Sequence, residues 1–495
     1  MLIRQAIGAN QPIPRTCPAP RGRPSAWTAL LAIILLGGCT AGPNYVRPAV
    51  EVPPAYKEAP GWKAAQPSDA APKGKWWEVY QDSQLDAFED QVTVSNQTIK
   101  SAVAQFAEAR AALRVSRADY FPTVTGGLSL DREHVSSNAP LFSKGVSKSD
   151  YSDYVLPIDA SYEPDLWGRV RRNVEASRSE AQATAADLAN VNLSMHAELA
   201  YDYFELRGLD AEEALLDSAV GSYQTALDLT EHRYKGGLVS AVDVAQAKTL
   251  LETTRAQAQD VGVSRASYEH AIAVLVGKPA STFSIAPLPL TAPPPQIPPG
   301  VPSDLLERRP DIAAAERRVE EANAQIGVAK TAYFPLVTLS GAGGFESGAL
   351  STLIQGPSGL WSFGAAGAET IFDAGRRRGL TQEAVALHDQ SVANYRQTVL
   401  GGFQEVEDNL AALRILQDEA QTESAAVAAA QHSLDLSINR YKGGVTSYLE
   451  VTTAQNAALA DEVTAVEILT RRLAASVLLV KALGGGWNVS QIPHV

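Results

Sequence analysis

The feature that most constrains the fold of this chain is an internal duplication. The segment Tyr120–Thr125 (YFPTVT) recurs as Tyr333–Thr338 (YFPLVT), and Arg233–Gly237 (RYKGG) recurs unchanged as Arg440–Gly444. A third pair, DLWGR starting at Asp165 and DAGR starting at Asp373, keeps the same order. Solenoids need three or more short repeats, so two copies about 200 residues long indicate a tandem duplication.

Each copy is predicted to contain a helix, two strands and then two long helices. In copy one a helix is expected over 83–118, and Pro122 stops it because proline lacks an amide hydrogen and disfavours helix before it. Segments 123–131 and 154–162 have good strand propensity, and the polar segment 138–150 between them predicts a loop.

The second copy repeats this order, with strands expected at 336–345 and 360–372. Helix–strand transitions are expected at Pro122, Pro335, Trp167, Gly168 and Gly375. Aromatic residues gather near the strand ends, as they do where a membrane protein meets the lipid–water interface. They are Tyr120, Phe121, Tyr162, Trp167, Tyr333, Phe334 and Phe372.

Two helical hairpins are the longest elements predicted. The stretch from Gly168 to Tyr234 contains no proline, and a helix of ~65 residues would be roughly 100 Å long. After a turn, small and apolar residues from Val244 to Leu275 recur at alternating steps of three and four, which predicts an antiparallel coiled-coil hairpin. Copy two repeats this hairpin.

These elements divide the chain into six segments. The two hairpin tips are expected at 235–241 and 442–448, and the proline-rich linker is expected to wrap the outside of the helices. The segments are a signal peptide at 1–38, an N-terminal segment at 39–82, repeat 1 at 83–276, the linker at 277–302, repeat 2 at 303–483 and a tail at 484–495.

The N-terminus predicts export and a lipid anchor. A basic start is followed by the apolar run Trp27–Leu36, which is too short to span a bilayer but suits a signal peptide. The run ends in Leu36-Gly37-Gly38-Cys39, which resembles a bacterial lipobox and predicts cleavage and acylation at Cys39. A plain secretory signal with a chance cysteine is the alternative. Thr40, in place of aspartate, favours the outer membrane.

Composition excludes several other classes of protein. Removal of the leader takes Cys17 with it, so the mature chain retains one cysteine and can form neither a disulfide nor a cysteine metal site. The chain has 55 acidic and 42 basic residues, which makes nucleic acid an unsuitable partner. The histidines are dispersed. The Gly341-Ala342-Gly343 segment lies in a strand context, so it does not predict a nucleotide site. We therefore expect no enzyme, cofactor or metal.

A membrane crossing is expected to use strands. No run of 18 apolar residues follows Leu36, and only helices and closed barrels satisfy the backbone in lipid. Four strands of about ten residues have the right length but cannot close a barrel, whereas three chains supply twelve strands. This predicts a homotrimer; two soluble hairpins on a helical protein are the alternative.

Several motifs together resemble one family. The paired YFP and RYKGG segments, Pro302–Ile312 (PSDLLERRPDI), Glu163–Arg169 (EPDLWGR) and Trp76-Trp77 closely resemble the TolC-like outer membrane factors, and the lipobox places the chain in their lipoprotein branch with NodT and OprM. The resemblance runs from about Cys39 to Gly486. It implies a mainly α fold with a membrane β-barrel, in which a trimer forms a 12-stranded β-barrel on a 12-helix periplasmic α-barrel.

The same resemblance implies partners and site residues. The partners are a periplasmic adaptor, an inner-membrane pump and outer-membrane lipid. The gate would be formed by Asp243 and Glu450, although Thr446 and Thr453 stand where the family has an arginine and a second acid. A solvated helix-end charge is the alternative role for both acids. The adaptor-docking tips would be Gly236, Gly237, Leu238, Val239 and Ser240, with Gly443, Gly444, Val445, Thr446 and Ser447; tight turns without a docking role are the alternative.

The predicted function is an exit duct for small molecules such as drugs, working with a resistance–nodulation–division pump. Protein secretion with an ABC transporter is the alternative. A periplasmic adaptor is a weaker rival, because adaptors resemble one hairpin and this chain has two.

Overall fold

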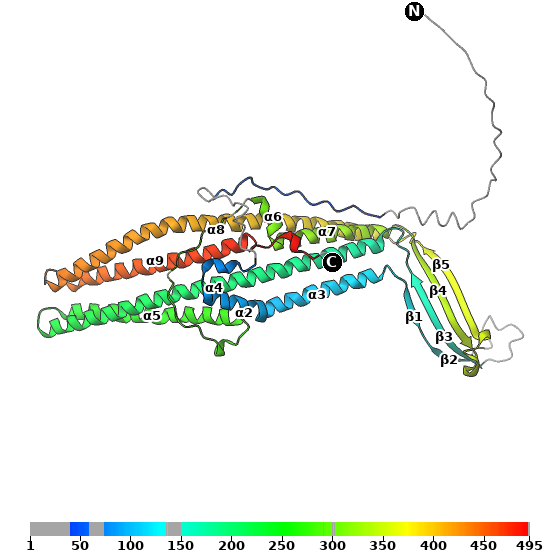
Figure 1. Cartoon of the computed structure of the whole chain (residues 1–495), viewed down its shortest axis with the longest axis horizontal. Helices are drawn as coiled ribbons and strands as arrows, with labels where there is room; N and C mark the ends of the chain where they lie inside the picture. The colour runs from blue at the N-terminus through cyan, green and yellow to red at the C-terminus, as the bar shows by residue number, and fades with distance from the viewer. Residues whose placement is uncertain are drawn as a thin grey trace, which may run out of the picture.

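The computed structural model describes residues 40–58, 74–134, 136, 150–290, 292–298, 300 and 302–493. Long helices lie side by side along most of the molecule, and one β-sheet extends from their end (Figure 1). The predicted signal peptide and Cys39 lie outside the described residues. Within the described part of the chain, no helix is both long and apolar enough to cross a membrane.

The two copies have matching elements, and the paired hairpin helices are equal in length. Helices α4 and α8 each contain 67 residues, and α5 and α9 each contain 35. Copy one consists of α2 (Ser83–Ser95), α3 (Gln97–Ala118), β1 (Thr123–Gly126), β2 (Ser129–His134), β3 (Asp150–Tyr162), α4 (Arg169–Lys235) and α5 (Ala241–Leu275). Copy two consists of α6 (Leu305–Arg308), α7 (Pro310–Thr331), β4 (Leu336–Ser347), β5 (Gly359–Ala368), α8 (Arg376–Lys442) and α9 (Tyr448–Ala482).

The prediction of a single helix over 83–118 is wrong, because the chain breaks at Asn96 into the two helices α2 and α3. The Asn96 backbone is extended, and its side-chain oxygen caps α3. Its side-chain amide nitrogen donates to the carbonyl of Leu275 over 2.9 Å. Copy two breaks at Arg309, whose guanidinium donates to the carbonyl of Ala482 over 3.1 Å. In each copy, therefore, a side chain at the break fastens the short helices to the end of the hairpin's return arm.

The strand limits also differ from prediction. Strand β3 begins at Asp150 instead of 154, and β4 ends at Ser347 instead of 345. Segment 123–131 forms two strands, β1 and β2, which both pair with β3 in one continuous antiparallel register. The strand predicted over 360–372 ends at Ala368. Beyond it, Ala374 and Gly375 have φ of 52° and 90°, and the Asp373 carboxylate accepts the amide of Gly375, so the chain turns into α8. The sheet order is β1-β3-β4-β5.

The two largest apolar cores of the described residues lie in the helical part and stabilise it. The larger lies where the short helices cross the middle of the hairpins and includes Trp76, Leu85, Tyr203 and Ile272. The smaller lies near the hairpin tips. Its buried members are Leu216, Tyr223, Leu227, Ala247, Leu250, Leu251, Tyr441, Tyr448, Val451 and Leu459. The heptad residues predicted between Val244 and Leu275 are all buried or half-buried.

A close helix–helix contact provides a test of the packing. A Cβ on Gly208 of α4 would lie 2.2 Å from Oγ1 and 2.7 Å from Cγ2 of Thr470 on α9. We expect Gly208→Ala to destabilise the protein by about 1–3 kcal/mol through overpacking, measured as a lower melting temperature. Adding Thr470→Ala should recover most of the loss. Gly221→Ala, at an open position of the same helix, is the control, and equal melting of the two alanine variants would contradict this contact.

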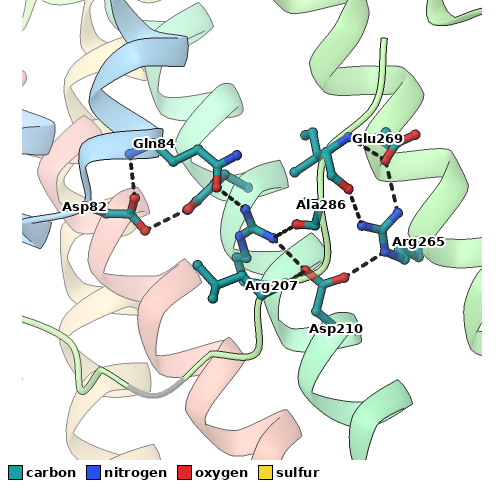
Figure 2. Close-up of polar contacts among 10 residues, drawn as sticks. Asp82, Gln84, Arg207, Asp210, Arg265, Glu269 and Ala286 are labelled. Carbon is teal, nitrogen blue, oxygen red and sulfur yellow. Dashed lines mark hydrogen bonds and ion pairs between the residues drawn. The ribbon is translucent and has the colours of Figure 1, made fainter.

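The linker between the copies is held by a buried polar group that we call the waist cluster: Arg207, Asp210, Arg265 and Glu269 (Figure 2). Asp210 accepts from Arg207 and Arg265, each over 2.7 Å, and from the linker amide of Leu288 over 2.9 Å. Both arginines also donate to linker carbonyls, and Glu269 accepts the amide of Ile285. These bonds fix the linker against α4 and α5.

An N-terminal strap, residues 40–58, runs along α4, α7 and α8. It starts beside Trp167, whose carbonyl accepts the amide of Ala41 over 2.9 Å, and reaches Arg414 of α8 through Glu58. Gly42 has a φ of 93°, and a Cβ there would lie 2.5 Å from the Cα of Gly327. The strap thus passes too close to α7 for a side chain at Gly42, whereas a Cβ at Gly327 would lie 2.8 Å from Cγ of Arg172 on α4.

Candidate hairpin tips and channel wall

The two tips are equivalent tight turns. In each, the second glycine, Gly237 or Gly444, has a positive φ of 72° or 74°, which glycine adopts without strain. The amide of Leu238 bonds to the carbonyl of Arg233 over 2.9 Å, and that of Val445 bonds to Arg440 over 3.0 Å. This is the six-to-one bond of a glycine C-cap. The RYKGG sequence therefore encodes the helix end itself.

Exposed apolar side chains project from both tips. Leu238 is 75% exposed and Val445 is 71% exposed. Val239, which is predicted to belong to the docking tip with Leu238, is half-buried against the smaller core. Leu449, which sequence reasoning did not single out, is exposed on the second tip. Each hairpin end thus exposes an apolar pair, Leu238 with Val242 and Val445 with Leu449. Such a pair is a surface suited to a protein partner.

The two predicted gate acids have local partners in the single chain. Asp243 forms a capping box with Ser240, whose amide and hydroxyl both donate to the carboxylate over 2.9 Å. Glu450 lies 2.9 Å from Arg440 and also accepts from the hydroxyl of Thr446. Glu450 is thus paired with a cation on its own hairpin, and Thr446, where the family has arginine, contributes a hydroxyl.

A contact that sequence reasoning missed joins the two tips. The Arg233 guanidinium donates to the carbonyls of Tyr441 and Lys442, each over 2.9 Å, and lies 4.8 Å from the Tyr441 ring centroid. Tyr441 packs edge-on against Tyr448, whose pKa is raised to about 12 by burial. The sequence marks Arg233 only as a repeat landmark, because its bridging role depends on the second hairpin lying beside the first.

The predicted helix–strand transitions lie together where the helices meet the sheet. Pro122 and Pro335 directly precede β1 and β4, and Gly168 and Gly375, with φ of 86° and 90°, are the N-caps of α4 and α8. The Trp167 indole donates to the carbonyl of Pro335 over 2.8 Å and stacks on Phe334. Trp167 therefore joins the junction of one copy to that of the other.

The strand register separates the sheet into two chemically different faces, because directly opposed residues of antiparallel strands point to the same side. Ala160, for example, opposes both Val124 and Gly341, and Gly341 opposes Phe363. We call this side the apolar face. Its large side chains are Val124, Leu130, Tyr154, Leu156, Ile158, Tyr162, Val337, Leu339, Phe345, Trp361 and Phe363.

The opposite side, here called the polar face, carries short polar and acidic residues. Asp159 opposes Thr125 and Ala342, and Ser161 opposes Thr123 and Ser340. A shallow hollow of about 290 Å³ on it is lined by Thr123, Thr125, Asp159, Ser161, Ser340, Ala342 and Ser362, and it also borders Ala160 and Gly341, whose positions belong to the apolar face. Among the described residues, no group of three or more His, Cys, Asp or Glu side chains could hold a metal ion.

One face suited to lipid and one suited to water define a segment of a membrane-channel wall, mounted on long hairpins. The sequence matches the family model "Outer membrane efflux protein" over residues 90–278 and 301–485. The chain therefore belongs to the outer membrane efflux protein family, whose members are outer-membrane channels.

Individual relatives agree with this assignment. The outer membrane protein OprJ of Pseudomonas aeruginosa is 32% identical over 465 residues, covering 93% of this chain and 96% of OprJ. The toluene efflux pump outer membrane protein TtgI of Pseudomonas putida is 32% identical, covering 93% and 98%. The structure of the outer-membrane channel OprN superposes with a TM-score of 0.84 at 30% identity, covering 91% of this chain and all of OprN. The Campylobacter jejuni CmeC channel gives 0.87 at 26% identity, covering 92% and 96%.

Proposed function

We propose that the chain is the exit duct of a tripartite efflux system, acting as a homotrimer with a periplasmic adaptor and an inner-membrane pump. The observation that carries the proposal is the two-faced sheet with two open edges. A sheet with one apolar and one polar face is stable in a membrane only when its edges are paired. Strands β1 and β5 are the edge strands of the β1-β3-β4-β5 order, so three chains joined edge to edge would close a wall of twelve principal strands.

The helices support the same closure. Near the sheet the packing order is α3, α4, α7 and α8, and towards the tips it is α5, α4, α9 and α8. Helix α8 therefore borders one side of the chain, with α3 and α5 on the other. Large apolar residues are exposed on these bordering helices: Leu380, Leu387, Leu400 and Leu436 on α8, and Val103, Val115, Val263 and Val274 on α3 and α5. A second copy would cover them.

The relatives favour small molecules as the cargo. They include outer membrane proteins of antibiotic, solvent and toluene efflux pumps, and we assign this chain to the same use. A proton-driven pump of the resistance–nodulation–division class fits that cargo, with lipidation at Cys39 as the membrane anchor. Protein secretion through an ABC transporter is the competing function.

Partner capture from the first tip tests the proposal. Leu238→Cys is a better attachment site than Val239→Cys, because Leu238 is exposed and Val239 is half-buried. Crosslinking in intact cells should attach a periplasmic adaptor of a proton-driven pump. An ABC-type adaptor would shift the function to protein secretion. With a reactive thiol shown by labelling, the absence of any adaptor would reject the tip assignment. Leu288→Cys, exposed on the linker away from the tip, is the control site.

Glu450→Gln tests the gate assignment. The substitution removes the charge that pairs with Arg440 while keeping the side-chain shape. We expect increased entry of large antibiotics and a weaker block of the channel by divalent cations. Antibiotic susceptibility and single-channel recordings would measure these effects. Arg440→Gln removes the other half of the ion pair, and unchanged leak and block in the Glu450 variant would reject its role in the gate.

A further inference from the structure

We propose that the polar face of the strands is a charge filter that favours cationic over anionic solutes, located in the membrane segment and independent of the hairpin tips. The inference rests on the proposed function, in which this face lines the pore. It assigns part of the duct's solute specificity to three carboxylates in particular: Asp131, Asp153 and Asp159.

The register divides the charges of the sheet unequally. Five carboxylates lie on the polar face: Asp131, Glu133, Asp153, Asp159 and Glu346. The basic side chains of the described strands, Arg132 and His134, lie on the other face, near the loop end of the sheet, where His134 opposes and bonds to Asp150. Within the described strands, the polar face therefore has acidic residues and no lysine or arginine.

The five acids of the polar face are not held as structural ion pairs within the described chain. Among the residues that the structure describes, none of the five forms a salt bridge, and Glu133 accepts only the hydroxyl of Tyr151. Asp131 and Asp153 stand directly opposite each other in the register. Like charges directly opposed across strands are destabilising. The sheet thus retains a local electrostatic cost without a compensating bond in the chain.

The acids are spread along the sheet in the direction in which a solute would travel. Asp159 lies in the hollow lined by threonine and serine, nearer the helices, and Asp153 and Asp131 lie towards the loop end. A trimer would repeat each position three times around the axis. A channel lined by one sign of charge concentrates counter-ions and repels co-ions. The range of this effect is about 10 Å at 0.1 M salt and about 3 Å at 1 M.

The test is the reversal potential of the purified full-length chain in planar lipid bilayers under a KCl gradient. The wild type should prefer K⁺ to Cl⁻. The triple variant Asp131→Asn, Asp153→Asn and Asp159→Asn should lower the cation-to-anion permeability ratio several-fold at 0.1 M salt and change it little at 1 M. Asp150→Asn is the matched control, because it removes a carboxylate from the same strand on the opposite face.

The outcomes separate this inference from the function on which it rests. If the wild type forms no pore, both the exit-duct function and the filter are rejected. If the wild type conducts and the triple variant has the same reversal potential, only the filter is rejected. A reversal potential that shifts in Glu450→Gln but not in the triple variant would place the selectivity at the tips and also reject the filter. Asp153→Asn singly, which relieves the Asp131 repulsion and should not impair folding, provides a second variant with an intermediate shift expected.

Discussion

Asp210→Ala is expected to release the linker from the first hairpin and to destabilise the protein by about 3–5 kcal/mol, the usual cost of removing one partner from a buried ion pair. Arg207 and Asp210 are each only 2% exposed. Without the carboxylate, the guanidiniums of Arg207 and Arg265 lose a partner at 2.7 Å, and the amide of Leu288 loses its acceptor. A lower melting temperature of the detergent-extracted protein, with faster proteolysis in the linker, would measure both effects.

The duplication supplies a position-matched control for this variant. Gln417 occupies the place of Asp210 in copy two and is exposed, so Gln417→Ala should change stability by only about 0.5 kcal/mol or less. Replacing all four members of the waist cluster together by apolar residues of similar size should be less damaging than Asp210→Ala, because no unpaired charge then remains buried. Similar melting of the Asp210 and Gln417 variants would show that the waist cluster does not hold the linker.

Arg233→Ala is expected to have the largest effect on gating. It removes two hydrogen bonds from a charged donor and a cation–π contact that join the first tip to the second. Together these contacts contribute on the order of 3 kcal/mol, so their loss would raise the ratio of separated to joined tips roughly a hundredfold. The expected result is frequent opening in single-channel recordings without adaptor, and increased susceptibility of cells to large antibiotics.

Two further variants define the mechanism of that effect. Arg233→Lys keeps the charge but cannot make the paired bonds to Tyr441 and Lys442, so an intermediate leak is expected. Arg255→Ala removes an arginine whose partners among the described residues, Glu252 and Gln224, lie within the first hairpin, and it should leave gating unchanged. If the channel of the Arg233→Ala variant stays closed in these recordings, other contacts hold the tips together.

Much of the architecture was predictable because its signals are local. The RYKGG copies encode a glycine C-cap, whose positive φ at Gly237 and Gly444 depends only on neighbouring residues. The proline-free stretch after Gly168 predicted a long helix because each helical hydrogen bond joins residues four apart. The matched landmarks of the duplication likewise predicted two sets of equivalent elements, and the two pairs of equally long hairpin helices confirm it.

The features that require distant segments could not be read from the chain. Asn96 breaks a helix because Leu275 lies beside it, and Arg233 bridges the tips because Tyr441 does. The waist cluster brings together two helices and a linker that a local pattern cannot bring into contact. The sequence by itself determined the duplicated elements, the hairpin turns and the family. Only the tertiary structure decided which strand faces are polar and which side chains join the hairpins, because strand register and helix contacts depend on how separate segments pack.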